Sequence, residues 1–185
     1  KFCGGVLYLN RITPAAVKPT GRVSGIPCQP EFGRHDTVIS TKPAYYTDLE
    51  QCVQALLDKV GNKVVIAGGF GRPVHIFNEL YRRAAADPGI QLTIITGASF
   101  CRPRGSSDLE KRFLDPFVDR VFGNQPELSY VQPYLKGQLP KNIEIVEVFL
   151  QAGVYMGNHH AQQNYVYSNF THWLRDMIEQ GCNVF

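Results

Sequence analysis

The 185-residue sequence lacks the features that mark several classes of protein. Its cysteines are odd in number and form no C-x-x-C pair, which argues against a disulfide framework or structural zinc site and favours a reducing compartment. No apolar run approaches the ~20 residues that span a bilayer, and no signal peptide is recognisable. The formal net charge of +3 is too small to indicate nucleic-acid binding. We therefore expect a cytoplasmic globular protein without a membrane, metal or nucleic-acid partner.

What is present is the composition of an ordinary globular protein, with 44% hydrophobic and 19% charged residues. The chain begins at Lys1 and closes on Cys-Asn-Val-Phe, which is typical of a strand that is opening, so we expect an excerpt of a longer protein. Residues 1–46 are rich in proline and glycine and predict an irregular N-terminal arm with short strands near 5–9 and 37–40. Residues 47–185 predict a single α/β domain.

Strand and helix patterns alternate through this second part of the chain. Thr47 and Glu50 have the spacing of a capping box, ahead of a helix that ends near residue 60. The β-branched run before Gly68 predicts a buried strand over 63–67, followed by a helix over 73–86 and a strand over 91–96. Ser107 and Glu110 form a second capping box and open a helix to about residue 122.

The C-terminal third is less regular. Pro116 is expected to bend or interrupt the helix that contains it. Residues 123–142 are turn-rich, 143–150 predict a strand, and 151–167 predict a long loop. Ser168 or Asn169 is expected to cap a final helix that ends at Gly181. Alternating strands and helices indicate an α/β fold, an open and mostly parallel sheet flanked by helices.

Ligands of open parallel sheets bind at the carboxyl ends of the strands. This rule brings three predicted loops into one candidate site, residues 68–73, 97–104 and 151–158. The first loop carries the strongest signal, because an apolar strand runs directly into Gly68, Gly69, Phe70 and Gly71 and then Pro73. Glycines let a ligand approach the main chain closely, and free N–H groups at a helix N-terminus suit a carboxylate, a phosphate or an oxyanion. A tight strand-to-helix turn is the alternative.

Two cofactor motifs are excluded at this loop. The third glycine of the dinucleotide fingerprint is missing, because Arg72, Pro73 and Val74 follow the Gly-Phe-Gly segment. A phosphate-binding P-loop is excluded as well, because no Gly-Lys-Ser/Thr follows.

The Gly-Gly-Phe-Gly stretch resembles the glycine loop of family I coenzyme A transferases, which also follows an apolar strand and leads through a proline into a helix. Over residues 60–185 the chain is similar to the N-terminal domain of the acetyl-CoA hydrolase/transferase branch. The resemblance implies a fold of the NagB/RpiA type and transfer of coenzyme A between carboxylic acids and acyl-CoA thioesters, or thioester hydrolysis. Coenzyme A would be a substrate, with no tightly bound cofactor.

The resemblance also implies a glutamyl-CoA intermediate whose glutamate lies in a second α/β half, ahead of a glycine-rich stretch. No glutamate of this sequence has that context, so we assign no catalytic residue in the chain. The missing C-terminal half would be a partner of this piece, and a homo-oligomer is also expected. Binding of acyl-CoA and a small carboxylic acid is assigned to the glycine loop, at Gly68, Gly69, Phe70, Gly71 and Pro73.

Other chemistry-bearing residues have a structural alternative beside the functional one. Arg102 and Arg104 lie close to Cys101 in the sequence. The alternatives are that they activate the thiol, that they instead receive the phosphates of coenzyme A, and that they belong to a solvated loop. The histidines lack a carboxylate at ligand spacing, so hydrogen-bonded loop residues are favoured over a metal site. A role facing the substrate stays open for Asn158, Gln162 and Gln163. Two rival functions remain, a non-enzymatic ligand-binding or subunit-interface module and a sugar-phosphate isomerase.

Overall fold

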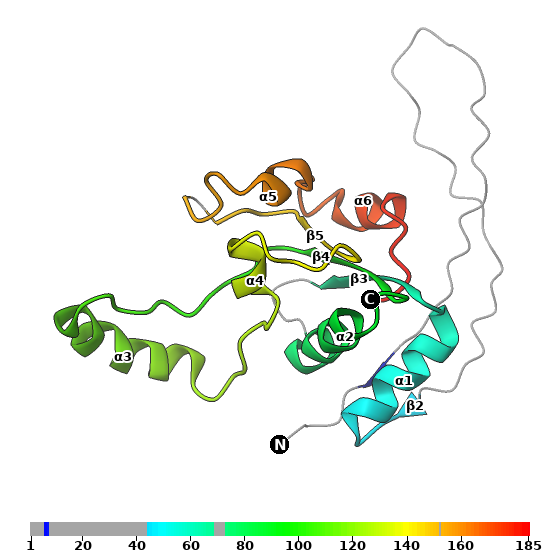
Figure 1. The fold of residues 1–185 in the computed structure, drawn as a ribbon, viewed down its shortest axis with the longest axis horizontal. Helices are drawn as coiled ribbons and strands as arrows, with labels where there is room; N and C mark the ends of the chain where they lie inside the picture. The colour runs from blue at the N-terminus through cyan, green and yellow to red at the C-terminus, as the bar shows by residue number, and fades with distance from the viewer. Residues whose placement is uncertain (1–5, 8–43, 69–72, 152) are drawn as a thin grey trace, which may run out of the picture.

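The computed structural model describes residues 6–7, 44–68, 73–151 and 153–185 (Figure 1). Most of the predicted N-terminal arm, with the strand expected near 37–40, lies outside these residues. Within it, β1 (Val6–Leu7) pairs antiparallel with β2 (Ala44–Tyr45). The strand expected near residues 5–9 is therefore confirmed in its central part.

Three parallel strands form the main sheet, in the order β3 (Lys63–Gly68), β4 (Gln91–Thr96) and β5 (Ile143–Glu147). The chain passes from β3 to β4 through α2 (Val74–Ala86), and from β4 to β5 through α3 (Asp108–Phe122) and α4 (Val131–Leu135). The predicted open, parallel α/β sheet is confirmed. Its strands are apolar on both faces, as expected of a sheet that is covered on both sides.

Alternate residues of each strand enter two separate cores, because successive side chains of a strand point to opposite faces. One core holds Val64, Leu92 and Ile145 and is covered by α1 (Leu49–Val60), α2 and α4. The other holds Val65, Ile95 and Val146 and is covered by α6 (Trp173–Glu179). Figure 1 shows the sheet between these layers, with α5 (His159–Gln163) beside β5.

The outer edge of β3 is closed by a segment from far along the chain. The Val65 amide donates to the Asn183 Oδ1 atom at 2.9 Å, and the Asn183 side-chain amide donates to the Lys63 carbonyl at 2.8 Å. The Ala67 amide donates to the Val184 carbonyl at 2.9 Å, in a parallel bridge that joins Ile66 and Val184. The strand expected to open near the end of the sequence is thus present as a single bridge.

Capping chemistry decides where the helices begin. The predicted box at Ser107 and Glu110 is confirmed, with both reciprocal hydrogen bonds formed. The box predicted at Thr47 is wrong, because Asp48 is the N-cap of α1 and its carboxylate accepts from the Gln51 amide at 2.8 Å. Aspartate one residue closer to the helix competes successfully for the same role.

Four further differences from the expected elements concern lengths and short helices. Helix α3 continues through Pro116 as one helix, so the proline does not interrupt it. Strand β5 ends at Glu147 instead of residue 150. Helices α4 and α5 were not expected, and α6 begins only at Trp173, because Asn169 Oδ1 accepts from the amides of the two residues ahead of that helix. Over the described part of the chain, the helices are too short and too polar to cross a bilayer.

Candidate functional site

The carboxyl ends of the three strands meet in one row. Gly68 of β3 is opposite Thr96 of β4, and Thr96 is opposite Glu147 of β5. An isolated parallel bridge joins Glu147 to Tyr165 and extends the row. The loops predicted to form a site therefore all begin at the same edge of the sheet.

Glycine, threonine and glutamate of this row share one face. They are in phase with Ile66, Ile94 and Ile145, which enter the core beneath α1, α2 and α4. Thr96 and Glu147 are both fully buried. At the positions where the strands otherwise carry apolar side chains, the row has a glycine (Gly68), a hydroxyl group (Thr96) and a carboxyl group (Glu147).

Helix α2 begins beyond the glycine loop on the same face. The Ile76 amide donates to the Pro73 carbonyl at 2.9 Å, so Pro73 is the N-cap and the helix starts one residue later than expected. In the described residues no side chain caps this end, and the first turn has no acidic residue. Of the five predicted binding residues, Gly68 and Pro73 are described, whereas Gly69, Phe70 and Gly71 lie outside the described residues. The positive end of the helix dipole is therefore left for an anion.

The loop after β4 holds a backbone conformation that an L-residue rarely adopts. Ala98 has a φ of 117°, the only positive value at a non-glycine residue in the described part of the chain. The preceding Gly97 is in close contact, because a Cβ atom there would lie 3.4 Å from the Trp173 ring. Such strain costs about 1–3 kcal/mol and is concentrated at functional sites. The strain at Ala98 makes the loop after the central strand β4 a candidate part of a functional site.

Three buried tyrosines lie beside this loop, on the same face of the sheet. The Tyr155 hydroxyl donates to the Ser99 carbonyl at 2.9 Å, and the Ser99 hydroxyl lies 3.0 Å from the Tyr130 hydroxyl. The ring centroids of Tyr134 and Tyr155 are 5.3 Å apart. Among the described residues the buried Tyr134 hydroxyl has no hydrogen-bond partner. A buried hydroxyl without a partner is costly in free energy and calls for a ligand or another explanation.

The carboxyl group of Glu147 lies close enough to this cluster to influence it. Burial, followed by the charge of the nearby Glu147 carboxylate, raises the pKa of both Tyr134 and Tyr155 well above the usual range. Both phenols therefore stay protonated at neutral pH and act as O–H donors. The site therefore offers the Tyr134 hydroxyl as a donor beside a buried carboxyl group, and a phenol donor of this kind can polarise a neutral carbonyl oxygen.

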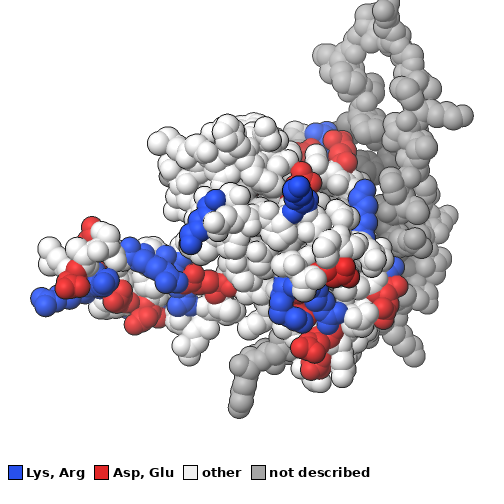
Figure 2. Space-filling model, in the orientation of Figure 1, with Lys and Arg blue, Asp and Glu red and all other residues white. Residues whose placement is uncertain are grey.

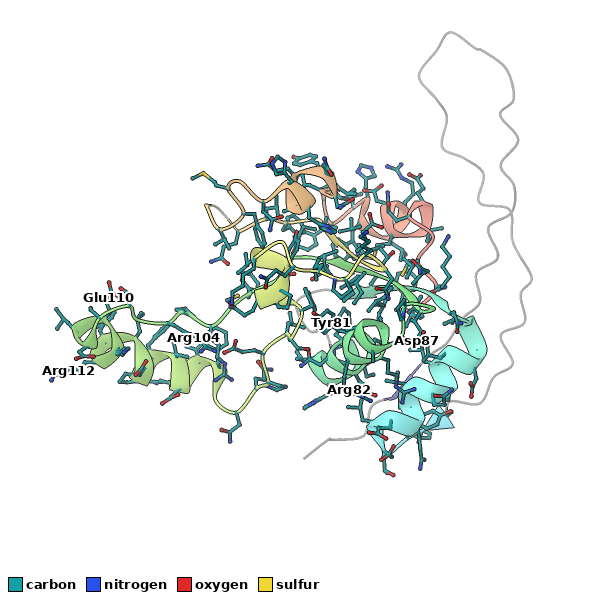
Figure 3. All side chains as sticks on the ribbon, in the orientation of Figure 1. Tyr81, Arg82, Asp87, Arg104, Glu110 and Arg112 are labelled. Carbon is teal, nitrogen blue, oxygen red and sulfur yellow. The ribbon has the colours of Figure 1, made fainter. Side chains whose placement is uncertain are left out.

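Cys101 and its flanking arginines have structural roles. Burial and the charge of Glu127 raise the pKa of the Cys101 thiol, so the activated thiolate considered from sequence is not supported. Arg104, labelled in Figure 3, binds the Glu127 carboxylate at 2.9 Å. Arg102 donates to the carbonyls of Gly123 and Gln125. Both arginines hold the loop after β4 against the segment that follows α3.

Two polar residues after β5, His160 and Asn158, make hydrogen bonds to the main chain. His160 Nε2 accepts from the Ile145 amide at 3.1 Å, and Asn158 caps α5 while its amide group donates to the Tyr134 carbonyl at 2.9 Å. Gln162 and Gln163 are exposed on α5. In the described ranges, no three histidine, cysteine, aspartate or glutamate side chains gather where they could hold a metal ion.

An open hollow of about 340 Å³ lies at the other end of the strands. Gln91 and Thr93 of β4, Ile143 and Glu144 of β5, and His160 line it. The row of Gly68, Thr96 and Glu147 is at the opposite edge. Because parallel sheets bind ligands at their carboxyl ends, the row is the better candidate.

Sequence reasoning missed Glu147 and the three tyrosines. Glu147 lies in the strand predicted over residues 143–150, and its odd-numbered position is in phase with the buried Ile143 and Ile145. That periodicity was the available signal for a buried carboxyl group. The tyrosines come from separate segments and had no comparable signal.

Comparison with protein families, curated proteins and solved structures found no match to this chain.

Proposed function

We propose that the chain is the N-terminal half of a coenzyme A transferase or acyl-CoA hydrolase, with the fold type of that family. It would move coenzyme A between a carboxylic acid and an acyl-CoA thioester, or hydrolyse the thioester. The observation that carries the proposal is the row of Gly68, Thr96 and Glu147 beside the strained Ala98 loop. This row lies at the edge of the sheet from which the Gly-Gly-Phe-Gly sequence continues.

The chemistry of the proposal needs a carboxylate nucleophile and donors for an oxyanion. A glutamate outside these 185 residues attacks the thioester carbonyl, the tetrahedral oxyanion collapses with loss of coenzyme A thiolate, and an acyl-glutamyl anhydride forms. The thiolate then attacks the glutamyl carbonyl and releases the carboxylic acid, which leaves a glutamyl-CoA thioester. Each step needs preorganised donors, and the loss of one donor costs roughly 3–4 kcal/mol.

Two features of the described residues show where donors for the substrate carboxylate or oxyanion are available. The first turn of α2 has neither a side-chain cap nor an acidic residue, which favours an anion at its N-terminus. The Tyr134 hydroxyl is a protonated, buried donor without a partner in the described part of the chain. In the proposal, main-chain amides of the glycine loop bind the substrate carboxylate or oxyanion, and the tyrosine cluster forms the opposite wall.

Calorimetric titration of the chain with acetyl-CoA, free coenzyme A and acetate tests the proposal. Gly71→Ala places a methyl group in the glycine loop, and Gly89→Ala is its matched control. Gly89 lies in the turn between α2 and β4, at the opposite edge, where a Cβ atom would meet only the flexible Asp87 carboxylate at 3.0 Å. We expect acetyl-CoA binding to weaken at least tenfold in Gly71→Ala and to be unchanged in Gly89→Ala. Equal binding by both variants would remove the glycine loop from the site.

Catalysis by the chain alone provides a separate check. Because the proposal locates the nucleophile outside the chain, we expect these 185 residues to bind acetyl-CoA without hydrolysing it. Thioester cleavage by the chain that is lost in Glu147→Gln would instead make the buried carboxylate the nucleophile and contradict this division of roles.

The rival function of a non-enzymatic interface module has one observation in its favour. Residues 148–174 contain no lysine, arginine, aspartate or glutamate, although Met156, Tyr167 and Phe170 in this stretch are largely exposed. Figure 2 shows the corresponding upper part of the molecule as an almost uncharged surface. A chain that fails to bind acetyl-CoA, coenzyme A and acetate in the titration above would favour this rival.

A further inference from the structure

A histidine side chain joins helix α5 to the outer edge of β5, the last strand of the main sheet (Figure 1). The Ile145 amide at this edge donates to the Nε2 atom of His160 at 3.1 Å. Two residues further along the strand, the Glu147 amide donates to the Asn164 carbonyl at 3.0 Å. At Ile145 an imidazole ring therefore does what a main-chain carbonyl does at Glu147.

This hydrogen bond exists only with a neutral His160. Because a backbone N–H group can only donate, Nε2 must offer its lone pair, and the proton of the neutral ring is then on Nδ1. A protonated imidazole carries an N–H group on both nitrogen atoms and accepts no hydrogen bond. Histidine is the side chain that ordinarily changes its charge between about pH 5 and 8. The contact between α5 and Ile145 thus belongs to one charge state of the ring.

The segment around His160 is connected to the buried tyrosines. The rings of His160 and Tyr134 meet edge to face, with their centroids 5.5 Å apart. Asn158, the N-cap of α5, donates from its side chain to the Tyr134 carbonyl at 2.9 Å and from its amide to the Tyr155 carbonyl at 3.1 Å. Ala161 of α5 is fully buried in the core that contains both tyrosines. Movement of α5 away from β5 would therefore disturb the tyrosine cluster.

A second position for the ring lies beside the first. His160 also lines the open hollow of about 340 Å³ at the amino ends of the strands, together with Glu144 and Lys141. The side chains of Glu144 and Lys141 are both exposed. A protonated ring that turns from the Ile145 amide into this hollow gains a carboxylate as an acceptor, and charge-assisted hydrogen bonds of this kind are strong.

The charged and titratable groups around His160 come from three elements and one turn. Glu144 of β5 favours the protonated ring, and Lys141, in the turn ahead of β5, opposes it. Tyr134 of α4 is uncharged at neutral pH, because burial raises the pKa of its hydroxyl. His159 precedes His160 on α5 and is exposed. The residues of β4 that line the hollow, Gln91, Leu92 and Thr93, do not titrate.

We propose that His160 is a pH-dependent latch for α5. The neutral ring accepts from the Ile145 amide and holds α5 against β5, whereas the protonated ring turns toward Glu144 and releases α5. The sign follows from the donors, because proton uptake replaces the acceptor with a second N–H group that faces the Ile145 amide. The docked form is therefore favoured at neutral pH and lost on acidification. This latch is independent of any reaction at the carboxyl edge of the sheet.

Nitrogen-15 NMR of the histidine rings tests the contact in the unmodified protein. At pH 8 the spectrum distinguishes a neutral ring that carries its proton on Nδ1 from one that carries it on Nε2. We expect the Nδ1–H form for His160, whose signals are assigned by their loss in His160→Gln. The Nε2–H form at His160 would overturn the proposal, since that nitrogen atom could not accept from the Ile145 amide.

Hydrogen exchange of the Ile145 amide tests the release, with the rate expressed as protection relative to an unstructured peptide at the same pH. His160→Gln keeps a side-chain acceptor that does not titrate, and His159→Gln makes the same change at the exposed neighbour. We expect protection to fall at least tenfold from pH 7.5 to 5.5 in the parent and in His159→Gln, and to stay constant in His160→Gln. Constant protection in the parent would refute the latch. An equal fall in His160→Gln would refute it as well, because another group would then be responsible.

Two charge variants test the position of the released ring. Glu144→Gln removes the acceptor in the hollow and should shift the loss of Ile145 protection to lower pH. Lys141→Gln removes the opposing charge and should shift that loss to higher pH. The same pH dependence in the parent and both variants would contradict the turn of His160 toward Glu144.

Discussion

Removal of one hydroxyl group from the chain should make the protein more stable. Tyr134→Phe deletes the buried hydroxyl that has no hydrogen-bond partner among the described residues. A buried polar group without a partner costs about 1–3 kcal/mol, and phenylalanine keeps the packing of the ring. We expect the free energy of unfolding to rise by about 1 kcal/mol, which corresponds to a Tm increase of about 2–4 °C for a chain of this length.

Tyr155→Phe is the matched control for this prediction. It deletes the same atom from a neighbouring buried ring, but that hydroxyl donates to the Ser99 carbonyl at 2.9 Å. Its loss leaves a buried carbonyl without this donor and should lower the free energy of unfolding by about 1–3 kcal/mol. The two substitutions, which are chemically identical, are therefore expected to have opposite signs.

Urea denaturation of the two variants and the parent, monitored by circular dichroism, gives the comparison directly. The same samples should show acetyl-CoA binding weakened about tenfold in Tyr134→Phe, since a donor that is costly without ligand is retained for function. A decrease of 1 kcal/mol or more in the free energy of unfolding of Tyr134→Phe would refute the reasoning, because it would mean that the hydroxyl already has a hydrogen-bond partner in the folded protein.

Two further predictions concern charge and backbone strain. The hydrogen bond from Arg82 lowers the pKa of Glu79; burial opposes this shift, and the hydrogen bond from Arg83 adds to it. Ionised Glu79 therefore stabilises the folded protein fully above the ordinary pKa of about 4.5, and this contribution is lost as the pH falls further. The stability difference between the parent and Glu79→Gln, measured in urea, should therefore be constant from pH 7 to 5 and shrink below pH 4.5; a difference that grows on acidification would contradict this sign. Ala98→Gly relieves a φ of 117°. It should therefore lower the free energy of unfolding by at least about 1 kcal/mol less than Ala84→Gly does in the interior of α2. Equal destabilisation of the two variants in thermal melts would mean that Ala98 is not strained.

The sheet was predictable because its signals are local. The β-branched residues ahead of Gly68 and the apolar run over residues 91–96 gave strands of nearly correct length, and parallel pairing followed from the helices between them. Ser107 was identified as a cap because its partner Glu110 is three residues away. At Thr47 the same rule failed, since Asp48 offers a carboxylate in a better position.

The tyrosine cluster was not predictable, because its contacts are long-range. Ser99 is 31 residues from Tyr130 and 56 residues from Tyr155 in the sequence. No helical or strand period links these positions. The strain at Ala98 was also hidden, because alanine at a φ of 117° has no sequence signature. The carboxyl edge of the sheet was predicted, and the side chains that occupy it were not.

The closure of the outer edge of β3 has a consequence for how the protein folds during synthesis. Val65 and Lys63 are held by Asn183, across 118 and 120 residues of chain. Such separations raise the contact order and slow the completion of a sheet. Until Asn183 leaves the ribosome, β3 presents unpaired N–H and C=O groups to other nascent chains. The outer edge of β3 can therefore be closed only after the segment around Asn183 has been synthesised.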